Sequence, residues 1–141
     1  IFSSFIMKNK QKLRKSVNEI INFTKKNNVK LALSTSTTIN NVEAVFKSLS
    51  NQISKEDFHF IGNRSLVKYE KPNPEIYKLT LEKLNLEPDN CLAIEDTEES
   101  SKSALSAGIK CIGFPGDYHS DDSFEMCIKK VKILDQSLFS L

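Results

Sequence analysis

Short apolar segments alternate with amphipathic helical patterns along this chain, and that alternation most narrows the folds open to it. Apolar residues from Leu13 to Ile21 recur at helical spacing, and further helices are predicted around 42–49, 73–85 and 98–107. The segments 29–33, 58–62, 91–94 and 109–114 are predicted strands, and a last helix and strand are expected near Val131 to Leu134. Strands alternating with helices predict an α/β fold: a Rossmann-like parallel sheet with helices on both faces, joined by right-handed crossovers.

Composition and charge narrow the class of protein further. The chain has 141 residues, about one domain, and its 4 Gly and 4 Pro argue against a low-complexity protein. Its net charge of +2 is too small to favour a nucleic acid or an anionic membrane as partner. No apolar run approaches the length of about 20 residues that a membrane span needs, so a cytoplasmic protein is expected.

The cysteines and the first residue carry weaker signals. Cys91, Cys111 and Cys127 form no C-x-x-C pair and are odd in number, so we expect buried thiols of a reducing compartment rather than a zinc cluster or a disulfide framework. The chain opens with Ile1 rather than Met and soon enters a helical pattern, which suggests a fragment of something longer.

Polar groups that could carry chemistry follow the predicted strands. Thr35 and Ser36 follow the first strand, Lys71 precedes the helix predicted from Asn73, and Glu95 and Asp96 follow the strand at 91–94. In an open parallel sheet, ligands bind beyond the carboxyl ends of the strands. Hydroxyls, backbone N–H groups, a cation and paired carboxylates are what a Mg²⁺-assisted phosphoryl site requires.

Each of these groups also has a plainer interpretation. A Ser/Thr run after a strand is typical of a turn or a helix cap. A loop lysine before proline is most often solvated, and Asp96 could cap the helix that follows it. His59 and His119 share no metal-ligand spacing, so neither is expected to be catalytic.

Three blocks in this order resemble the haloacid dehalogenase superfamily. Within it the chain is most similar to the branch of β-phosphoglucomutases and sugar-phosphate phosphatases, CbbY-type phosphatases included. The blocks are Leu31-Ala32-Leu33-Ser34-Thr35-Ser36, Lys71-Pro72-Asn73-Pro74-Glu75-Ile76-Tyr77 and Cys91-Leu92-Ala93-Ile94-Glu95-Asp96-Thr97, followed by Ala104, Ala107-Gly108-Ile109 and Ile112-Gly113. The likeness extends from about Leu13 to the C-terminus.

The resemblance implies a role for each matching residue. Thr35 matches the hydroxyl that binds the substrate phosphoryl group, and Ser36 the neighbour whose backbone N–H assists it. Lys71 matches the lysine that neutralises charge between nucleophile and phosphate. Glu95 and Asp96 match the acids that hold Mg²⁺ directly or through water. In the family an aspartate attacks phosphorus to form an aspartyl-phosphate, which water then hydrolyses.

The family's D-x-D motif, which supplies that nucleophile on the first strand, does not occur here. No Asp precedes Asp57, so no nucleophile is expected in this chain. The resemblance implies that the N-terminal strand and most of the helical cap domain are missing. Residues 1–12 would then be the remnant of the cap or its return linker, and 13–141 the α/β core. A second departure is Ser100-Ser101, which stand where the family usually has Gly followed by an apolar residue. The acids Glu98 and Glu99 just before them are interpreted as suited to a helix start.

These expectations lead to a principal function and its rivals. We expect the C-terminal part of a cytoplasmic Mg²⁺-dependent phosphatase that acts on a small phosphorylated metabolite, with sugar phosphates as the favoured class, and that is inactive as this piece alone. A phosphomutase of the same branch is the alternative. A carbon–halogen hydrolase needs no Mg²⁺, so the acid pair argues against it. A non-catalytic relative that binds phosphate or a protein partner is the rival from another class.

Overall fold

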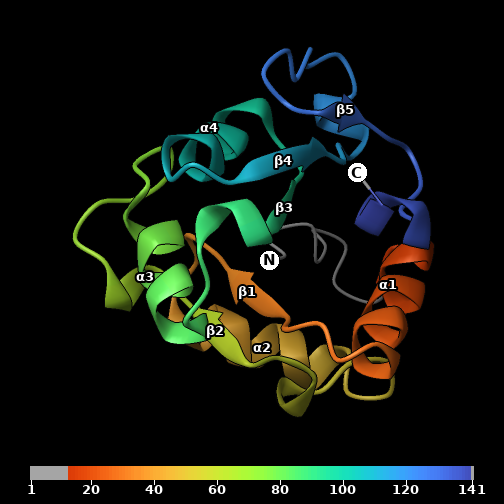
Figure 1. The fold of residues 1–141 in the computed structure, drawn as a ribbon. Coiled ribbons are helices and arrows are strands. Elements are labelled where there is room, and N and C mark those ends of the chain that lie inside the picture. Colours follow the sequence, from red (N-terminus) through yellow and green to blue (C-terminus); the bar gives the residue numbers. More distant parts are fainter. Residues whose placement is uncertain (1–12, 141) are drawn as a thin grey trace.

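A computed structural model describes residues 13–140, and residues 1–12, where a cap remnant was expected, lie outside the described part. The α-helices of this part are α1 (Lys15–Lys26), α2 (Ile39–Ser48), α3 (Glu75–Leu84) and α4 (Glu98–Ser106). The strands are β1 (Ala32–Ser34), β2 (Phe60–Gly62), β3 (Leu92–Glu95), β4 (Lys110–Gly113) and β5 (Lys129–Lys130). Strands and helices alternate as the sequence predicts (Figure 1).

All the strand pairings within residues 13–140 are parallel. β1 pairs with β2, and β4 lies between β3 and β5. Because β3 and β4 are parallel, Glu95 and Gly113 end their strands at the same edge. Ser34 ends β1 beside them, since the Lys71 side chain contacts both Ser34 and Glu95. The predicted parallel α/β architecture is therefore confirmed.

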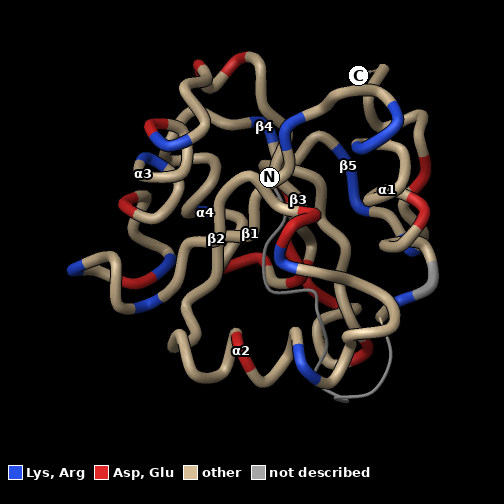
Figure 2. The backbone as a smooth tube through the Cα atoms, turned by 90° about the horizontal axis from the view of Figure 1, so that it is seen from below, with Lys and Arg blue, Asp and Glu red and all other residues tan. Residues whose placement is uncertain are grey.

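Alternate residues of the strands face opposite helical layers. Leu33, Ile94 and Ile112 belong to a core cluster with apolar residues of α1 and α2. Ala93 and Cys111, their neighbours along the strands, pack instead with α3 and α4. A sheet covered on both faces explains why its strands are nearly continuous apolar runs. Positive and negative residues are interspersed around this core (Figure 2).

Helix starts and strand ends differ from the predictions by one or two residues. Glu95 lies inside β3 rather than after it, and its side chain is fully buried. The N-cap of α4 is Thr97, whose side chain accepts a hydrogen bond from the Ser100 N–H, so the interpretation of Asp96 as the cap is wrong. Thr97 takes the N-cap position because its short side-chain hydroxyl reaches a backbone N–H two to three residues further along the helix. Glu98 lies in the first turn of α4, as expected.

Two other sequence predictions need correction. The helix at 73–85 begins at Glu75 with Pro74 as its N-cap, although the Asn73 side chain still accepts a hydrogen bond from the Glu75 N–H at 3.0 Å. The helix and strand expected near 131–134 are absent from the described residues there, where the backbone makes bends between β5 and a 3-10 turn at Gln136–Ser140. Of the cysteines only Cys111 is buried, and Cys91 and Cys127 are half-buried. Among residues 13–140, no helix is long and apolar enough to cross a membrane.

Replacing Asn85 with alanine should lower the free energy of unfolding by about 1 kcal/mol. Asn85 ends α3 in the left-handed conformation, with φ at 54°, which an alanine Cβ disfavours and glycine accepts. Urea unfolding of Asn85→Ala and Asn85→Gly is the measurement, with the glycine variant as the matched control. Equal losses for the two variants would contradict the assignment of the cost to backbone conformation.

Candidate active site

A buried ion pair joins the predicted lysine to the first of the predicted acids. Lys71 Nζ lies 2.5 Å from Glu95 Oε1, and the exposed fractions of the two side chains are 3% and 0%. The same ammonium donates to the backbone oxygen of Ser34 at 2.9 Å. Lys71 therefore bridges the carboxyl ends of β1 and β3, which the sequence placed in one crevice without predicting contact between these side chains.

Helix α3 holds the acid from the other side. The Tyr77 hydroxyl, which is fully buried, donates to Glu95 Oε1 at 2.5 Å. One turn along, the Thr80 and Ser34 hydroxyls are 2.7 Å apart, and Thr80 also donates to the backbone oxygen of Ile76. Tyr77 and Thr80 are three residues apart and thus share a face of the helix. The sequence analysis did not single them out; two hydroxyls on an otherwise apolar helix face were the available signal.

The hydroxyl pair after β1 adjoins this bridge. Thr35 is buried; its N–H donates to the Gly62 oxygen at 3.1 Å, and its hydroxyl accepts from the Thr37 N–H at 3.2 Å. This hydrogen bond is typical of a turn, so the plainer interpretation of Thr35 also describes its geometry. Ser36 is half-exposed beside it. Since Lys71 binds the oxygen of Ser34, all three predicted groupings converge on one edge of the sheet.

The carboxylates at this edge fit a hard divalent cation. Glu95 Oε2 is buried and has no hydrogen-bond partner among the described residues, while Asp96 follows directly at the strand end. The part of the chain that the structure describes contains no group of three or more His, Cys, Asp or Glu side chains placed to hold a metal. Mg²⁺ keeps several waters and commonly takes only one or two protein carboxylates beside substrate phosphate. Glu95 and Asp96 are two side chains at this edge that could contribute ligands to such an ion.

Arg14 is a neighbour that the sequence analysis missed. Its guanidinium donates to the backbone oxygens of Phe114 at 2.7 Å and Pro115 at 3.0 Å, just beyond the end of β4. It also stacks on the Phe114 ring, 3.3 Å from the centroid. Burial lowers the pKa of Arg14 from its ordinary value, and the charges of Asp96 and Asp117 oppose that shift. An arginine keeps its charge under such a shift, so α1 brings a fixed cation to the region of Asp96.

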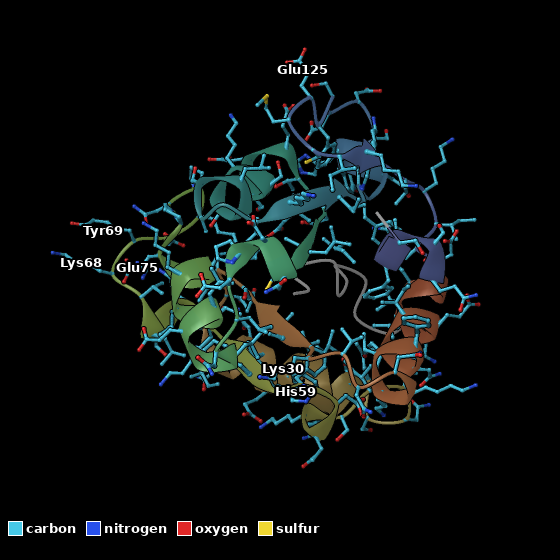
Figure 3. The ribbon with its side chains drawn as sticks, viewed as in Figure 1. Lys30, His59, Lys68, Tyr69, Glu75 and Glu125 are labelled. Carbon is cyan, nitrogen blue, oxygen red and sulfur yellow. The ribbon has the colours of Figure 1, made fainter. Side chains whose placement is uncertain are left out.

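The loop that carries Lys71 is fastened by its own helix. Both carboxylate oxygens of Glu75 accept backbone N–H groups, from Lys68 at 2.8 Å and from Tyr69 at 2.9 Å. These hydrogen bonds lower the pKa of Glu75 below its ordinary value. Figure 3 shows Lys68, Tyr69 and Glu75 together at one side of the molecule, where this loop turns toward α3. Glu75 thus sets the path of the backbone between β2 and α3.

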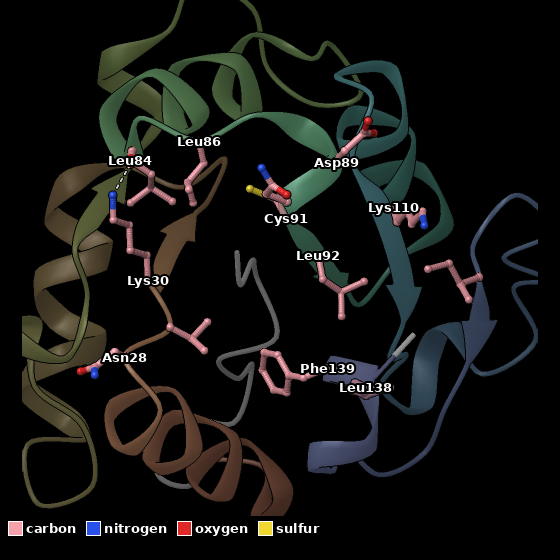
Figure 4. A pocket seen from close by; sticks show the side chains of 13 residues that line it. Asn28, Lys30, Leu84, Leu86, Asp89, Cys91, Leu92, Lys110, Leu138 and Phe139 are labelled. Carbon is pink, nitrogen blue, oxygen red and sulfur yellow. Dashed lines mark hydrogen bonds between the residues drawn. The ribbon is translucent and has the colours of Figure 1, made fainter.

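The described residues also line a cavity of about 440 Å³, which lies at the opposite edge of the sheet. Its walls come from the amino ends of the strands and include Lys30, Cys91 and Leu92 (Figure 4). Lys30 Nζ donates to the backbone oxygen of Leu84 there. His59, which directly precedes β2, accepts a hydrogen bond from the Leu31 N–H and so supports the backbone. This cavity shares no residue with the Lys71 and Glu95 pair, which remains the better candidate for chemistry.

Comparison with known proteins identifies the family to which this chain is similar. Residues 1–108 match the family model described as haloacid dehalogenase-like hydrolase. Protein CbbY of Cereibacter sphaeroides is 33% identical over 112 residues, 79% of this chain and 49% of the relative. A phosphorylated carbohydrates phosphatase of Thermotoga maritima is 36% identical over 113 residues, 79% of this chain and 48% of the relative.

A solved structure extends the likeness to three dimensions. The crystal structure of a CbbY mutant from Rhodobacter sphaeroides in complex with xylulose-(1,5)bisphosphate superimposes with a TM-score of 0.82 at 29% identity, over 91% of this chain and 57% of that one. The chain thus spans about half the length of the curated relatives it matches. Together, the matched residues and the shared fold show that the chain belongs to the haloacid dehalogenase-like hydrolase family.

Proposed function

We propose that the natural protein containing this chain is a Mg²⁺-dependent phosphatase of small phosphorylated metabolites, with sugar phosphates as the favoured class. The observation that carries the proposal is the buried Lys71 and Glu95 pair, which places a cation and a carboxylate at the strand edge beside Thr35. The phosphorylated carbohydrates phosphatase and the CbbY structure with a bound sugar bisphosphate support the substrate class.

The residues at this edge divide the work of binding a phosphoryl group. Thr35 and Ser36 supply a hydroxyl and a backbone N–H to its oxygens, and the ammonium of Lys71 offsets their negative charge. Glu95 and Asp96 would hold Mg²⁺, which would supply further charge neutralisation. Lys71 is already fixed by Ser34 and Glu95, so little reorganisation is needed when charge builds up on the phosphoryl group.

The attacking carboxylate lies outside this sequence. No Asp precedes Asp57, and no D-x-D follows an apolar strand. Transfer through an aspartyl-phosphate therefore requires a residue that these 141 residues do not provide. The chain by itself should bind but not turn over phosphate esters.

Release of inorganic phosphate from a panel of sugar phosphates tests the proposal in the natural protein. Activity should require Mg²⁺, and Asp96→Asn should reduce kcat/KM by about 100-fold or more because a charged metal ligand is lost. Asp89→Asn is the matched control, since Asp89 is an exposed acid that lines the cavity at the opposite edge. It should leave kcat/KM within about twofold.

Other outcomes would overturn parts of the proposal. Conversion of one sugar phosphate to its isomer without net release would identify a phosphomutase. Halide release without Mg²⁺ would identify a carbon–halogen hydrolase, and phosphate binding without turnover a non-catalytic relative. Mg²⁺-dependent release by the 141-residue chain alone, abolished by Asp96→Asn, would show that the nucleophile had been misplaced.

A further inference from the structure

Two of the cysteines lie side by side on the sheet face covered by α3 and α4. Cys111 is in the middle of β4 and is fully buried. The N–H of Ile128 donates to the backbone oxygen of Cys111 at 2.9 Å, which lays Cys127 alongside β4 just before β5 begins. Both side chains pack in the same apolar cluster. Neither was given a role by the sequence analysis beyond that of a buried thiol.

The thiol of each of these two cysteines affects the pKa of the other. The Cys111 thiol, which also lies 3.7 Å from the backbone oxygen of Ile112, can donate to the sulfur of Cys127; this stabilises the thiolate form and lowers the pKa of Cys127 to about 7. The same hydrogen bond, together with burial, raises the pKa of Cys111. One thiol of the pair is thus set to ionise near neutral pH while the other remains the proton donor.

Charged and polar neighbours from the packed elements modulate this pair. The Ser101 hydroxyl of α4 also lowers the pKa of Cys127, whereas burial and the acids Glu95 and Glu98 raise it. The charge of Lys71, at the end of the loop from β2, opposes the upward shift in the pKa of Cys111. The hydrogen bond from Cys111 is the largest of the effects on Cys127.

Cys91 provides an internal contrast. It is half-buried like Cys127, but it lines the cavity at the other edge of the sheet. Burial raises the pKa of Cys91 above its ordinary value. At neutral pH, thiolate chemistry should therefore concentrate at Cys127, because the thiolate and not the thiol is the nucleophile.

We propose that Cys127 and Cys111 form a redox modification site that a hydroperoxide converts to an intramolecular disulfide. The thiolate sulfur of Cys127 attacks one oxygen of hydrogen peroxide; an S–O bond forms, the O–O bond breaks, and hydroxide leaves to be protonated to water. The sulfur of Cys111 then attacks the sulfur of Cys127. The S–S bond forms, the S–O bond breaks, and the departing hydroxide takes the thiol proton of Cys111 as water.

The atoms and electrons of the two steps balance, and the disulfide adds a local cross-link to the fold. Two thiols and one hydrogen peroxide give one disulfide and two waters, and the two sulfurs lose the two electrons that the peroxide gains. The disulfide ties β4 to the segment 120–128, whose Asp122 side chain accepts the Glu98 N–H at 3.1 Å. The modification therefore lies next to the first turn of α4, which follows Glu95 and Asp96.

The first test compares alkylation rates of the three thiols in the unmodified chain with iodoacetamide at neutral pH. Cys127 should react at least about fivefold faster than Cys91, after allowance for the lower nucleophilicity of a less basic thiolate. The ratio should fall as the pH is raised well above neutral, because burial raises the pKa of Cys91 and its thiolate forms only at more alkaline pH. Equal rates at neutral pH, or a ratio that does not fall, would overturn the proposal.

The second test treats the chain with hydrogen peroxide and maps the peptides by mass. The expected product has lost two hydrogen atoms, links residues 111 and 127 within one molecule, and reverts with dithiothreitol. Met126, which is 79% exposed in the same segment, gains an oxygen instead and so is told apart by mass. Links that involve Cys91, or only links between molecules, would overturn the assignment.

Variants separate the two roles. Cys91→Ser is the matched control and should form the link at the unmodified rate. Cys127→Ser should form none, and Cys111→Ser, which keeps a hydroxyl donor beside Cys127 but cannot form a disulfide, should let a sulfenic acid at Cys127 accumulate, trapped by dimedone. A sulfenic acid that accumulates equally with Cys111 in place would show that Cys111 does not resolve it.

Discussion

Replacing Lys71 with methionine should lower the free energy of unfolding by about 3–5 kcal/mol, as expected when one partner of a buried ion pair is removed. The cost arises because Glu95, fully buried and also bonded to the Tyr77 hydroxyl, would be left with an uncompensated charge. Methionine keeps the length and the apolar stem of lysine, so lost packing contributes little. Equilibrium unfolding in urea, monitored by circular dichroism, is the measurement.

Two further variants make this result specific to the buried pair. Lys55→Met breaks an exposed pair with Glu43, whose side chains are 44% and 50% exposed, and should cost no more than about 1 kcal/mol. Adding Glu95→Gln to Lys71→Met should recover part of the loss, because the neutral amide needs no counter-charge and can still accept from Tyr77. Additive losses in the double variant would contradict the buried-charge explanation.

Replacing Phe124 with alanine should cost about 3–5 kcal/mol of unfolding free energy, the usual range for a buried phenylalanine. Phe124 is 3% exposed, and its backbone is held at φ 50°, a conformation that aromatic residues rarely adopt. A Cβ on Gly113 would lie 2.5 Å from the Phe124 ring, so the ring packs directly against the end of β4. Packing rather than local preference therefore holds this segment in place.

The matched control for Phe124 is Met126 in the same segment. Met126→Ala should change the free energy of unfolding by no more than about 0.5 kcal/mol, because its side chain is 79% exposed. Thermal and urea unfolding of the two variants give the comparison directly. Similar small losses for both would mean that the segment 120–128 does not pack on β4 through Phe124.

The order of elements and the edge that holds the site could be predicted from sequence because both depend on local pattern. Apolar runs and helical spacing fix the alternation, and the parallel topology then places Thr35, Lys71 and Glu95 at one edge. The contact between Lys71 and Glu95 could not be predicted in this way. It depends on how the β1–β2 pair packs beside β3 and on the path of the loop before α3, which are set by contacts across the whole core.

Arg14 and the C-terminal segment also could not be predicted from local sequence patterns, because their structure depends on contacts with distant residues. Arg14 has no local motif; its role depends on backbone oxygens a hundred positions away in the chain. The short strand β5 consists of two exposed lysines, which carry no apolar alternation, so the pattern near Val131 was assigned to elements that the structure does not contain. Edge strands are often short and charged because this discourages pairing with other chains.

The contacts of α1 determine when this domain can finish folding during synthesis. The Ser16 hydroxyl accepts the Leu134 N–H across 118 positions, and Val17 packs in a cluster that includes Leu134 and Leu138. When only the first half of this sequence has been made, residues of β1 and α2 can already pack on α1, but the part of its apolar stripe that contacts Leu134 and Leu138 is still uncovered. Such non-local pairing slows folding and leaves surface for chaperones to bind, until the residues around Leu134 emerge and cover the helix.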